Sequence, residues 1–242
     1  MASKKINIEN KSFDISYEIV NPTAKKDFVV LHGWGSNKEL MKNAFSSFLA
    51  EYRHIYIDLP GFGKSTNTYE LKTSDYYKII EEFLKQLNSS KDIIAGHSYG
   101  GKVATLLNPK NLVLLSSAGI LEEKSFDTKL KIFIAKTFNK LGLKKFTKIF
   151  RSDDVNTMSE NMYATFKNVV DEDFTSSFSA FKNRALIFWG EKDTATSLSS
   201  GKKIASLIDN SAFISYDGDH YFFLKNAKEI CERIENAVHW IL

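Results

Sequence analysis

The feature that most constrains this chain is a serine between two glycines, in the stretch Ile-Ile-Ala-Gly-His-Ser-Tyr-Gly-Gly that ends at Gly101. An apolar run typical of a buried strand ends at Ala95, and a helical composition follows the motif. A strand that turns at once into a helix brings its neighbours very close, and glycine fits there because it has no side chain. Gly96 and Gly100 therefore predict a sharp turn that holds Ser98 in a strained conformation.

Such a turn gives its serine a chemical role. The helix that follows points its free N–H groups and the positive end of its dipole at the hydroxyl. Ser98 is then a candidate nucleophile with an anion-stabilising site beside it. The alternative is a glycine-rich turn that happens to contain a serine. The strand before it, the helix after it and the partners found elsewhere in the sequence favour the nucleophile.

Apolar runs and helical stretches alternate along most of the chain. We predict strands at residues 28–31, 55–57, 93–95, 112–115, 185–189 and 212–216, and helices at residues 40–50, 74–87, 102–107, 201–208 and 227–242. Residues 5–8 and 13–20 alternate apolar and polar side chains, which predicts an antiparallel hairpin at a sheet edge. Strands separated by helices predict a mostly parallel, doubly wound α/β sheet.

The alternation stops between residues 119 and 184, where helical stretches such as residues 130–138 replace strands. An insertion at this point would sit over the carboxyl ends of the strands, where open α/β sheets bind ligands. We therefore interpret residues 119–184 as a helical lid, and residues 1–118 and 185–242 as the two parts of the core.

Composition disfavours several classes of protein. Cys231 is the only cysteine, so neither an internal disulfide nor a cysteine metal cluster can form, which fits a cytoplasmic setting. Residues 1–9 lack the apolar segment of a signal peptide, and no window approaches the roughly 20 apolar residues of a membrane span. The net charge of +4 does not by itself call for nucleic acid.

A serine hydroxyl is a poor nucleophile at neutral pH and needs a base within hydrogen-bond reach. His220 is the best candidate among five histidines, because it lies in a loop between the last predicted strand and the last helix. His239 lies in that helix and His54 precedes a strand. His97 adjoins the serine, so its side chain should point into the structure. His32 belongs to a His-Gly loop, and such a histidine more often braces the loop than transfers protons.

The base in turn needs a group that orients it. Asp193 lies just past a predicted strand, at the carboxyl end where the other candidates gather. It would fix the imidazole tautomer of His220 and stabilise the charged form of that ring. Glu191 is a weaker candidate, and Asp217 and Asp219 are too close to His220 in sequence to face its far nitrogen.

An attacked carbonyl becomes an oxyanion, which needs hydrogen-bond donors aimed at it. We expect one donor to be the backbone N–H of Tyr99, at the start of the helix that follows the serine. The other should be the backbone N–H of Trp34, in the loop His-Gly-Trp-Gly.

Five motifs occur along the chain: His-Gly-Trp-Gly from His32, Asp-Leu-Pro-Gly-Phe-Gly-Lys-Ser from Asp58, Gly-His-Ser-Tyr-Gly-Gly from Gly96, Trp-Gly-Glu-Lys-Asp from Trp189 and Gly-Asp-His-Tyr-Phe-Phe from Gly218. In order and spacing they resemble the α/β-hydrolase fold family, most closely its small lidded serine esterases and carbon–carbon hydrolases. The resemblance spans the chain except the lid. It implies an eight-stranded sheet flanked by helices, and no cofactor.

Two features of the sequence refine that resemblance. The nucleophile position holds Ser98 and not an aspartate, which disfavours the dehalogenase and epoxide hydrolase branches of the family. The helix after the serine should be a turn or two shorter than in relatives, because Pro109 ends it.

Basic residues gather in the first half of the predicted lid, interleaved with apolar residues at helical spacing. They are Lys124, Lys129, Lys131, Lys136, Lys140, Lys144, Lys145, Lys148 and Arg151. The simplest interpretation is a solvated lysine face over a packed apolar face. The alternative is a face that meets an acidic partner or a membrane surface, such as an acyl carrier protein that delivers an acyl ester.

Three functions follow from these features. The first is a serine hydrolase that cleaves a carboxylic ester through an acyl-enzyme on Ser98. The second uses the same triad to cleave a carbon–carbon bond in a dienoate or a β-diketone-like substrate. The triad cannot separate these two, because both reactions place an oxyanion in the same hole. The third is a binding module that uses the cavity as a receptor site.

Overall fold

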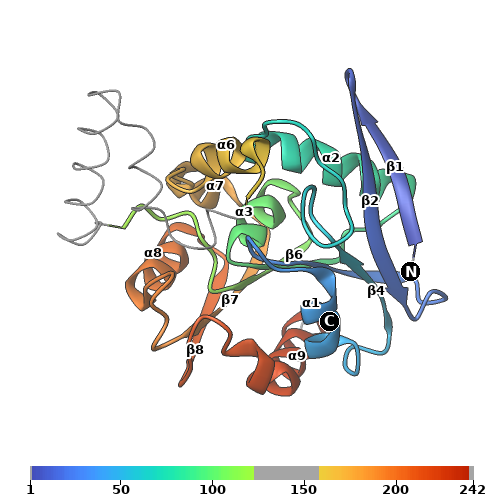
Figure 1. The fold of residues 1–242 in the computed structure, drawn as a ribbon. Coiled ribbons are helices and arrows are strands. Elements are labelled where there is room, and N and C mark those ends of the chain that lie inside the picture. The colour runs from blue at the N-terminus through green and yellow to red at the C-terminus, as the bar shows by residue number, and fades with distance from the viewer. Residues whose placement is uncertain (1, 123–157, 240–242) are drawn as a thin grey trace, which may run out of the picture.

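The computed structural model describes residues 2–122 and 158–239, in which eight strands form one sheet (Figure 1). The strands are β1 (Ala2–Ile8), β2 (Lys11–Val20), β3 (Lys26–Leu31), β4 (Tyr52–Ile57), β5 (Ile93–His97), β6 (Asn111–Leu115), β7 (Arg184–Gly190) and β8 (Ser211–Tyr216). Their order across the sheet is β1-β2-β4-β3-β5-β6-β7-β8. The pairs β1–β2 and β2–β4 are antiparallel and every other pair is parallel. The predicted mostly parallel sheet with an edge hairpin is therefore confirmed.

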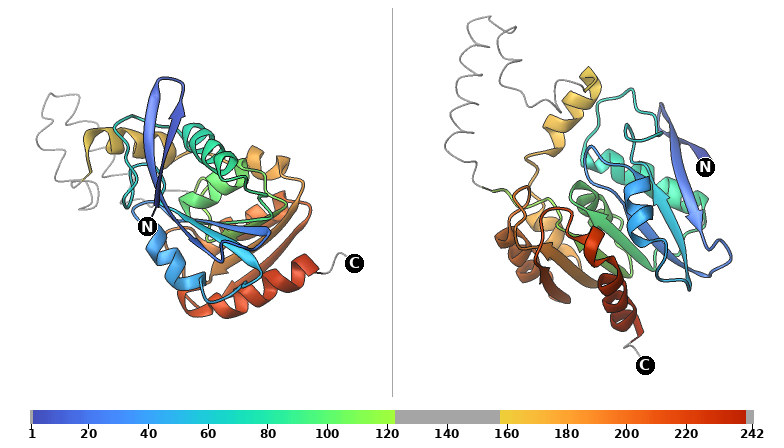
Figure 2. Two further views of the ribbon diagram at one scale, coloured as in Figure 1. Left: turned by 90° about the vertical axis from the view of Figure 1, so that its right-hand side faces the viewer. Right: turned by 60° about the horizontal axis from the view of Figure 1, so that its bottom comes forward.

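Helices cover both faces of this sheet. They are α1 (Lys38–Phe45), α2 (Thr73–Gln86), α3 (Tyr99–Leu106), α6 (Glu160–Val169), α7 (Thr175–Ala180), α8 (Leu198–Leu207) and α9 (Phe223–His239). Helices α1 and α9 lie on one face, whereas α2, α3, α7 and α8 lie on the other (Figures 1 and 2). None of the described helices is both long and apolar enough to cross a membrane.

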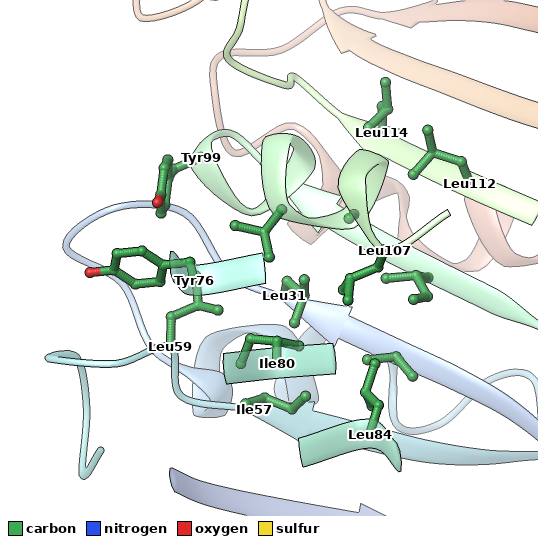
Figure 3. Close-up of a cluster of buried hydrophobic side chains, with 14 of the residues drawn as sticks. Leu31, Ile57, Leu59, Tyr76, Ile80, Leu84, Tyr99, Leu107, Leu112 and Leu114 are labelled. Atoms are coloured by element: carbon green, nitrogen blue, oxygen red, sulfur yellow. The ribbon is translucent and has the colours of Figure 1, made fainter. Parts of the chain in front are cut away.

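The central strands are buried on both faces, as their continuous apolar runs predict. In β3, Val29 and Leu31 belong to the core under α2 and α3, and their neighbour Val30 belongs to the core under α1 and α9. Figure 3 shows part of the first core, where Ile80 of α2 lies near Leu31 and Ile57 of the sheet. This two-sided packing fixes the carboxyl ends of the parallel strands at one edge, where the candidate site residues follow.

Two local predictions were wrong. Helix α1 ends at Phe45 instead of residue 50, because the chain turns there: the Phe48 N–H donates to the Phe45 carbonyl at 3.1 Å, and Leu49 takes a φ of 51°. Strand β4 begins at Tyr52, so His54 lies inside a strand and does not precede one. The end of helix α3 was predicted correctly: α3 ends at Leu106, close to the predicted residue 107 and before Pro109.

Helix α6, in the insertion between β6 and β7, docks on the loop of residues 67–71 through polar side chains along one face. Asn161 donates to two backbone carbonyls of that loop. Thr165 accepts the Leu71 N–H at 3.0 Å, and Asn168 donates to the Leu71 carbonyl at 3.2 Å. Because each contact uses loop backbone, they fix α6 against the core.

The other end of α6 is held by Lys102 of α3, a buried lysine. Its ammonium donates to the carbonyls of Val169 at 2.7 Å and of Glu172 at 3.2 Å. Burial lowers the pKa of Lys102, although the nearby Glu172 carboxylate opposes that shift. The predicted helix at residues 130–138 and the basic residues between 124 and 151 lie outside the described residues.

Candidate active site

Ser98 lies between β5 and α3 with backbone angles of φ 50° and ψ −117°. A positive φ is strained for a residue with a side chain, so this turn is held by its surroundings. The Ser98 N–H donates to the Leu115 carbonyl at 3.1 Å, and the Ala118 N–H donates to the Ser98 carbonyl at 3.0 Å. The strained turn that the sequence predicts is therefore present.

The flanking glycines are required by close contact, as predicted. A Cβ on Gly96 would lie 2.4 Å from the Gly100 carbonyl oxygen. A Cβ on Gly100 would lie 2.6 Å from the His32 carbonyl oxygen, which belongs to the neighbouring loop after β3. Contacts this short do not occur, so the turn and that loop can pack together only with glycine at both positions.

Asp193 and His220 meet beyond the ends of β7 and β8. The Nδ1 atom of His220 lies 2.7 Å from Asp193 Oδ2, and the Asp193 side chain is fully buried. Backbone N–H groups of Ala195 and Thr196 donate to Asp193 Oδ1 at 2.8 and 2.9 Å. Burial opposes the charge on Asp193, but the hydrogen bonds from His220 and Thr196 outweigh it and lower the pKa of this carboxyl to about 2. Asp193 is thus an ionised acceptor for a proton on His220 Nδ1.

The other acidic candidates lie elsewhere. Glu191 accepts a hydrogen bond from the Ser215 hydroxyl at 2.7 Å, and Asp217 pairs with Lys192 at 2.5 Å on the surface. Asp219 accepts the N–H of Tyr221 at 2.8 Å, within the His220 loop.

The structure does not join all three predicted residues by hydrogen bonds. Within residues 2–122 and 158–239, no hydrogen bond connects the Ser98 hydroxyl to His220. Catalytic hydrogen bonds are often long without substrate and tighten when it binds. His97 lies next to both residues. It precedes Ser98 in the sequence, and its ring centroid lies 4.5 Å from the ring centroid of His220.

The loop after β3 faces the serine turn. A Cβ on Gly33 would lie 3.1 Å from the Ser98 Cβ, so this loop passes directly beside the serine side chain. The backbone N–H groups of Trp34 and Tyr99, the two predicted oxyanion donors, take part in none of the backbone hydrogen bonds of the described residues.

His32 braces this loop, as the sequence predicts. Its Nδ1 lies 2.7 Å from the Gly33 carbonyl oxygen, and its Nε2 accepts the Leu59 N–H at 3.0 Å. Burial lowers the pKa of His32 to about 4, so the ring is neutral near pH 7. With both nitrogens engaged, His32 holds two loops together.

The glycine-rich loop after β4 is held by a buried ion pair that the sequence did not reveal. Lys38 Nζ lies 2.6 Å from Asp58 Oδ2, and both side chains are fully buried. Asp58 also accepts the N–H of Lys64 at 3.0 Å, which closes the loop on itself. This loop supplies Gly61 and Phe62 to the cavity beside the site.

A cavity of about 600 Å³ opens between the His32 loop and the His220 loop, within the range of small-molecule sites. It is lined by Trp34, Gly35, Gly61, Phe62, Met158, Ser159, Met162 and Tyr221. The Trp34 ring packs edge-on against the Phe62 ring, with 4.8 Å between the ring centroids. The centroid of the Phe166 ring, on α6, lies 5.4 Å from that of Trp34. Among the described residues, no group of three or more His, Cys, Asp or Glu side chains could hold a metal ion.

His54 serves structure, away from the candidate site. His54 is buried, with Nδ1 2.8 Å from the Tyr56 hydroxyl and Nε2 3.0 Å from the Leu49 carbonyl. His239 is the last residue of α9. Sequence reasoning placed His97 in the interior but missed its contact with His220, because no local pattern reports which way the His97 ring turns at the end of β5.

Comparisons with known proteins identify the family. The profile of the alpha/beta hydrolase family matches residues 28–232. A pimeloyl-[acyl-carrier protein] methyl ester esterase from Wigglesworthia glossinidia brevipalpis is 27% identical over 204 residues, which cover 78% of this chain and 70% of that protein. A candidate esterase/lipase from Mycoplasma pneumoniae is 27% identical over 156 residues; these cover 61% of this chain and only 57% of that relative's length.

A solved structure shares the fold. An esterase (EaEST) from Exiguobacterium antarcticum matches with a TM-score of 0.76 at 22% identity, covering 98% of this chain and 99% of that chain. The family profile spans most of the sequence, and the eight-stranded sheet agrees with it. This chain therefore belongs to the alpha/beta hydrolase family.

Proposed function

We propose that this protein is a serine hydrolase that cleaves carboxylic esters. Ser98 is the nucleophile, His220 is the base, and Asp193 orients and stabilises His220. The observation that carries the proposal is the 2.7 Å contact between His220 Nδ1 and Asp193 Oδ2, at the same edge of the sheet as the strained Ser98. An ionised carboxylate on Nδ1 keeps the proton there, which leaves Nε2 free to accept one.

The reaction follows from these roles. Ser98 Oγ attacks the ester carbonyl carbon while its proton passes to His220 Nε2. The carbonyl oxygen becomes an oxyanion, and the backbone N–H groups of Trp34 and Tyr99 are the donors that would bind it. The bond to the alcohol then breaks, and the alcohol leaves with the proton from His220. A water molecule, deprotonated by the same nitrogen, releases the acid and restores Ser98.

The wall of the cavity is partly polar and partly apolar. Phe62, Met162 and the Trp34 ring offer apolar surface, and no described lining residue carries a full charge. A methionine in such a wall adapts its shape to the ligand. We therefore expect higher kcat/KM for esters of medium acyl chains than for acetate esters.

The decisive variant is Ser98→Ala, with Ser206→Ala on the exposed face of α8 as the matched control. Ser98→Ala should reduce hydrolysis of p-nitrophenyl butyrate by about 10⁵-fold or more, as removal of a triad serine does elsewhere, and leave the circular dichroism spectrum unchanged. Ser206→Ala should match the wild type. Esterase activity retained in folded Ser98→Ala would refute the assignment of the nucleophile.

A substrate panel separates the ester reaction from its alternative. Carbon–carbon cleavage would use the same three residues, so only turnover can decide between them. We expect p-nitrophenyl esters to be hydrolysed and a ring-fission dienoate to be left intact. Faster turnover of the dienoate would replace the ester assignment with the carbon–carbon one.

The basic stretch of the sequence bears on the size and charge of the substrate. An acyl ester on an acidic carrier protein would meet Lys144, Lys145 and Lys148 if this stretch is a docking face. Changing all three to glutamate should then lower kcat/KM for the carrier-bound ester and leave that for p-nitrophenyl butyrate unchanged. Equal effects on both substrates would reject the carrier.

A further inference from the structure

His97 occupies a position that none of the roles above uses. It is the last residue of β5, its side chain is buried, and it immediately precedes Ser98. Its ring centroid lies 4.5 Å from that of His220, 4.8 Å from Phe223 and 5.2 Å from Tyr221. The ring therefore fills the space between the serine turn and the loop that carries His220.

The hydrogen bond of His97 defines its tautomer. Nε2 lies 3.0 Å from the backbone carbonyl oxygen of His220. A carbonyl oxygen only accepts, so Nε2 must carry the proton and donate it. Burial and the nearby His220 lower the pKa of His97 to about 3, so the ring is neutral with Nδ1 unprotonated near neutral pH.

The opposite side of the His97 ring faces the loop after β3, which contains Gly33 and Trp34. Nδ1 is buried and has no hydrogen-bond partner among the described residues. A Cβ on Gly33 would lie 3.0 Å from this Nδ1 and 3.1 Å from the Ser98 Cβ. Gly33 precedes Trp34, the proposed oxyanion donor. The His97 ring therefore contacts both the loop after β3, which contains Trp34, and the loop that contains His220.

We propose that His97 is a positioning residue that fixes the backbone and the ring face of His220 relative to Ser98. This inference rests on the proposed function. Asp193 holds Nδ1 of His220, but one hydrogen bond leaves the ring free to pivot about that contact. The His97 donor fixes the His220 carbonyl, and the His97 ring blocks one side of the pivot. Together the two contacts direct His220 Nε2 toward the serine turn.

Two substitutions separate the donor from the ring. His97→Phe keeps an aromatic ring but removes the N–H. His97→Gln removes the ring but carries an amide N–H₂ that can reach the place of Nε2. His54→Phe is the matched control, because His54 is also a buried histidine that donates or accepts through its ring but belongs to β4, outside the site.

We expect His97→Phe to lower kcat by about 10²-fold with little change in KM, since misplacing a catalytic group by about 1 Å has that effect. His97→Gln should restore the part of the loss that comes from the missing donor, and the rest of the loss measures the contribution of the ring. His54→Phe should lower the melting temperature and leave kcat of the folded enzyme unchanged. Equal kcat for wild type and His97→Phe would overturn the donor role.

A second measurement decides the proposal without relying on turnover. In ¹⁵N-labelled full-length protein, the imidazole nitrogens of His97 should show the Nε2–H tautomer and no titration between pH 5 and 8. The nitrogen shifts of His220 should change in His97→Phe and remain near wild type in His97→Gln. An Nδ1–H tautomer of His97, or unchanged His220 shifts in His97→Phe, would reject the proposal.

The two claims fail in different ways. If the wild type hydrolyses no ester, the proposed function is wrong, while the tautomer and the His220 shifts still decide whether His97 positions His220. If ester hydrolysis is present but insensitive to His97→Phe, the function stands and the positioning role is wrong.

Discussion

Replacement of Asp193 by asparagine tests the orientation of His220 with a single-atom change. Asp193 Oδ1 accepts two backbone N–H groups, from Ala195 at 2.8 Å and from Thr196 at 2.9 Å. In Asp193→Asn the amide oxygen must keep this place, because the opposite orientation would set its NH₂ against two donors. The NH₂ then faces His220 Nδ1, where Asp193 Oδ2 lies at 2.7 Å in the wild type.

The expected fall in kcat of Asp193→Asn follows from these hydrogen bonds. Flipping the amide would lose two hydrogen bonds and leave two buried N–H groups unpaired, at about 1–3 kcal/mol each. The variant therefore keeps the orientation that donates to Nδ1 and drives the His220 proton to Nε2. With Nε2 protonated, the ring cannot take the serine proton, and kcat should fall by about 10⁴-fold, equivalent to about 5.5 kcal/mol of activation free energy.

The assay is steady-state hydrolysis of p-nitrophenyl butyrate at pH 7.5, with melting temperature as the check on folding. Asp209→Asn is the matched control, because Asp209 forms an exposed ion pair with Lys182. That control should retain wild-type kcat. A folded Asp193→Asn enzyme with kcat within tenfold of the wild type would refute the account of His220 orientation.

Three further outcomes are expected. The pKa of Asp193 is lowered from 3.8 to about 2 in the folded state. Its charge therefore stabilises the fold by about 2 kcal/mol above pH 4, and this is lost as the pH falls to about 2. Urea unfolding of wild type and Asp193→Asn should show a difference that shrinks over that range, and a constant difference would contradict it. Lys38→Met should lower the free energy of unfolding by about 3–5 kcal/mol, because it leaves the buried Asp58 carboxylate without its cation; addition of Asp58→Asn should recover part of it. Lys102→Met should raise KM for medium-chain esters while kcat changes little, because it frees the Val169 carbonyl at the end of α6; unchanged KM would mean that α6 is held by its other contacts alone.

Most of the fold could be predicted because its signals are local. Apolar runs of β3, β5, β6 and β7 lie where the sequence predicts them, and each is buried on both faces. The turn at Ser98 was predictable from its glycines, since their contacts leave no room for a Cβ. The end of α1 was not, because it depends on Leu49 taking a positive φ, which residue type does not indicate.

The site was predictable where its residues follow the ends of strands. Asp193 and His220 could be paired from that rule, and the structure places them in contact. Three other features depend on tertiary packing and have no sequence pattern. They are the contact of His97 with the His220 loop, the buried Lys38–Asp58 pair, and Met162 in the wall of the cavity.

The central claim is that Ser98 is the reactive residue and that His220 makes it so. The most direct measurement is peptide mass spectrometry of the protein after treatment with a fluorophosphonate. We predict one phosphonyl group per chain, on Ser98, and labelling slowed by at least about 10³-fold in His220→Gln, since the serine then lacks its base. An adduct on another residue, or equal labelling rates in wild type and His220→Gln, would contradict the account.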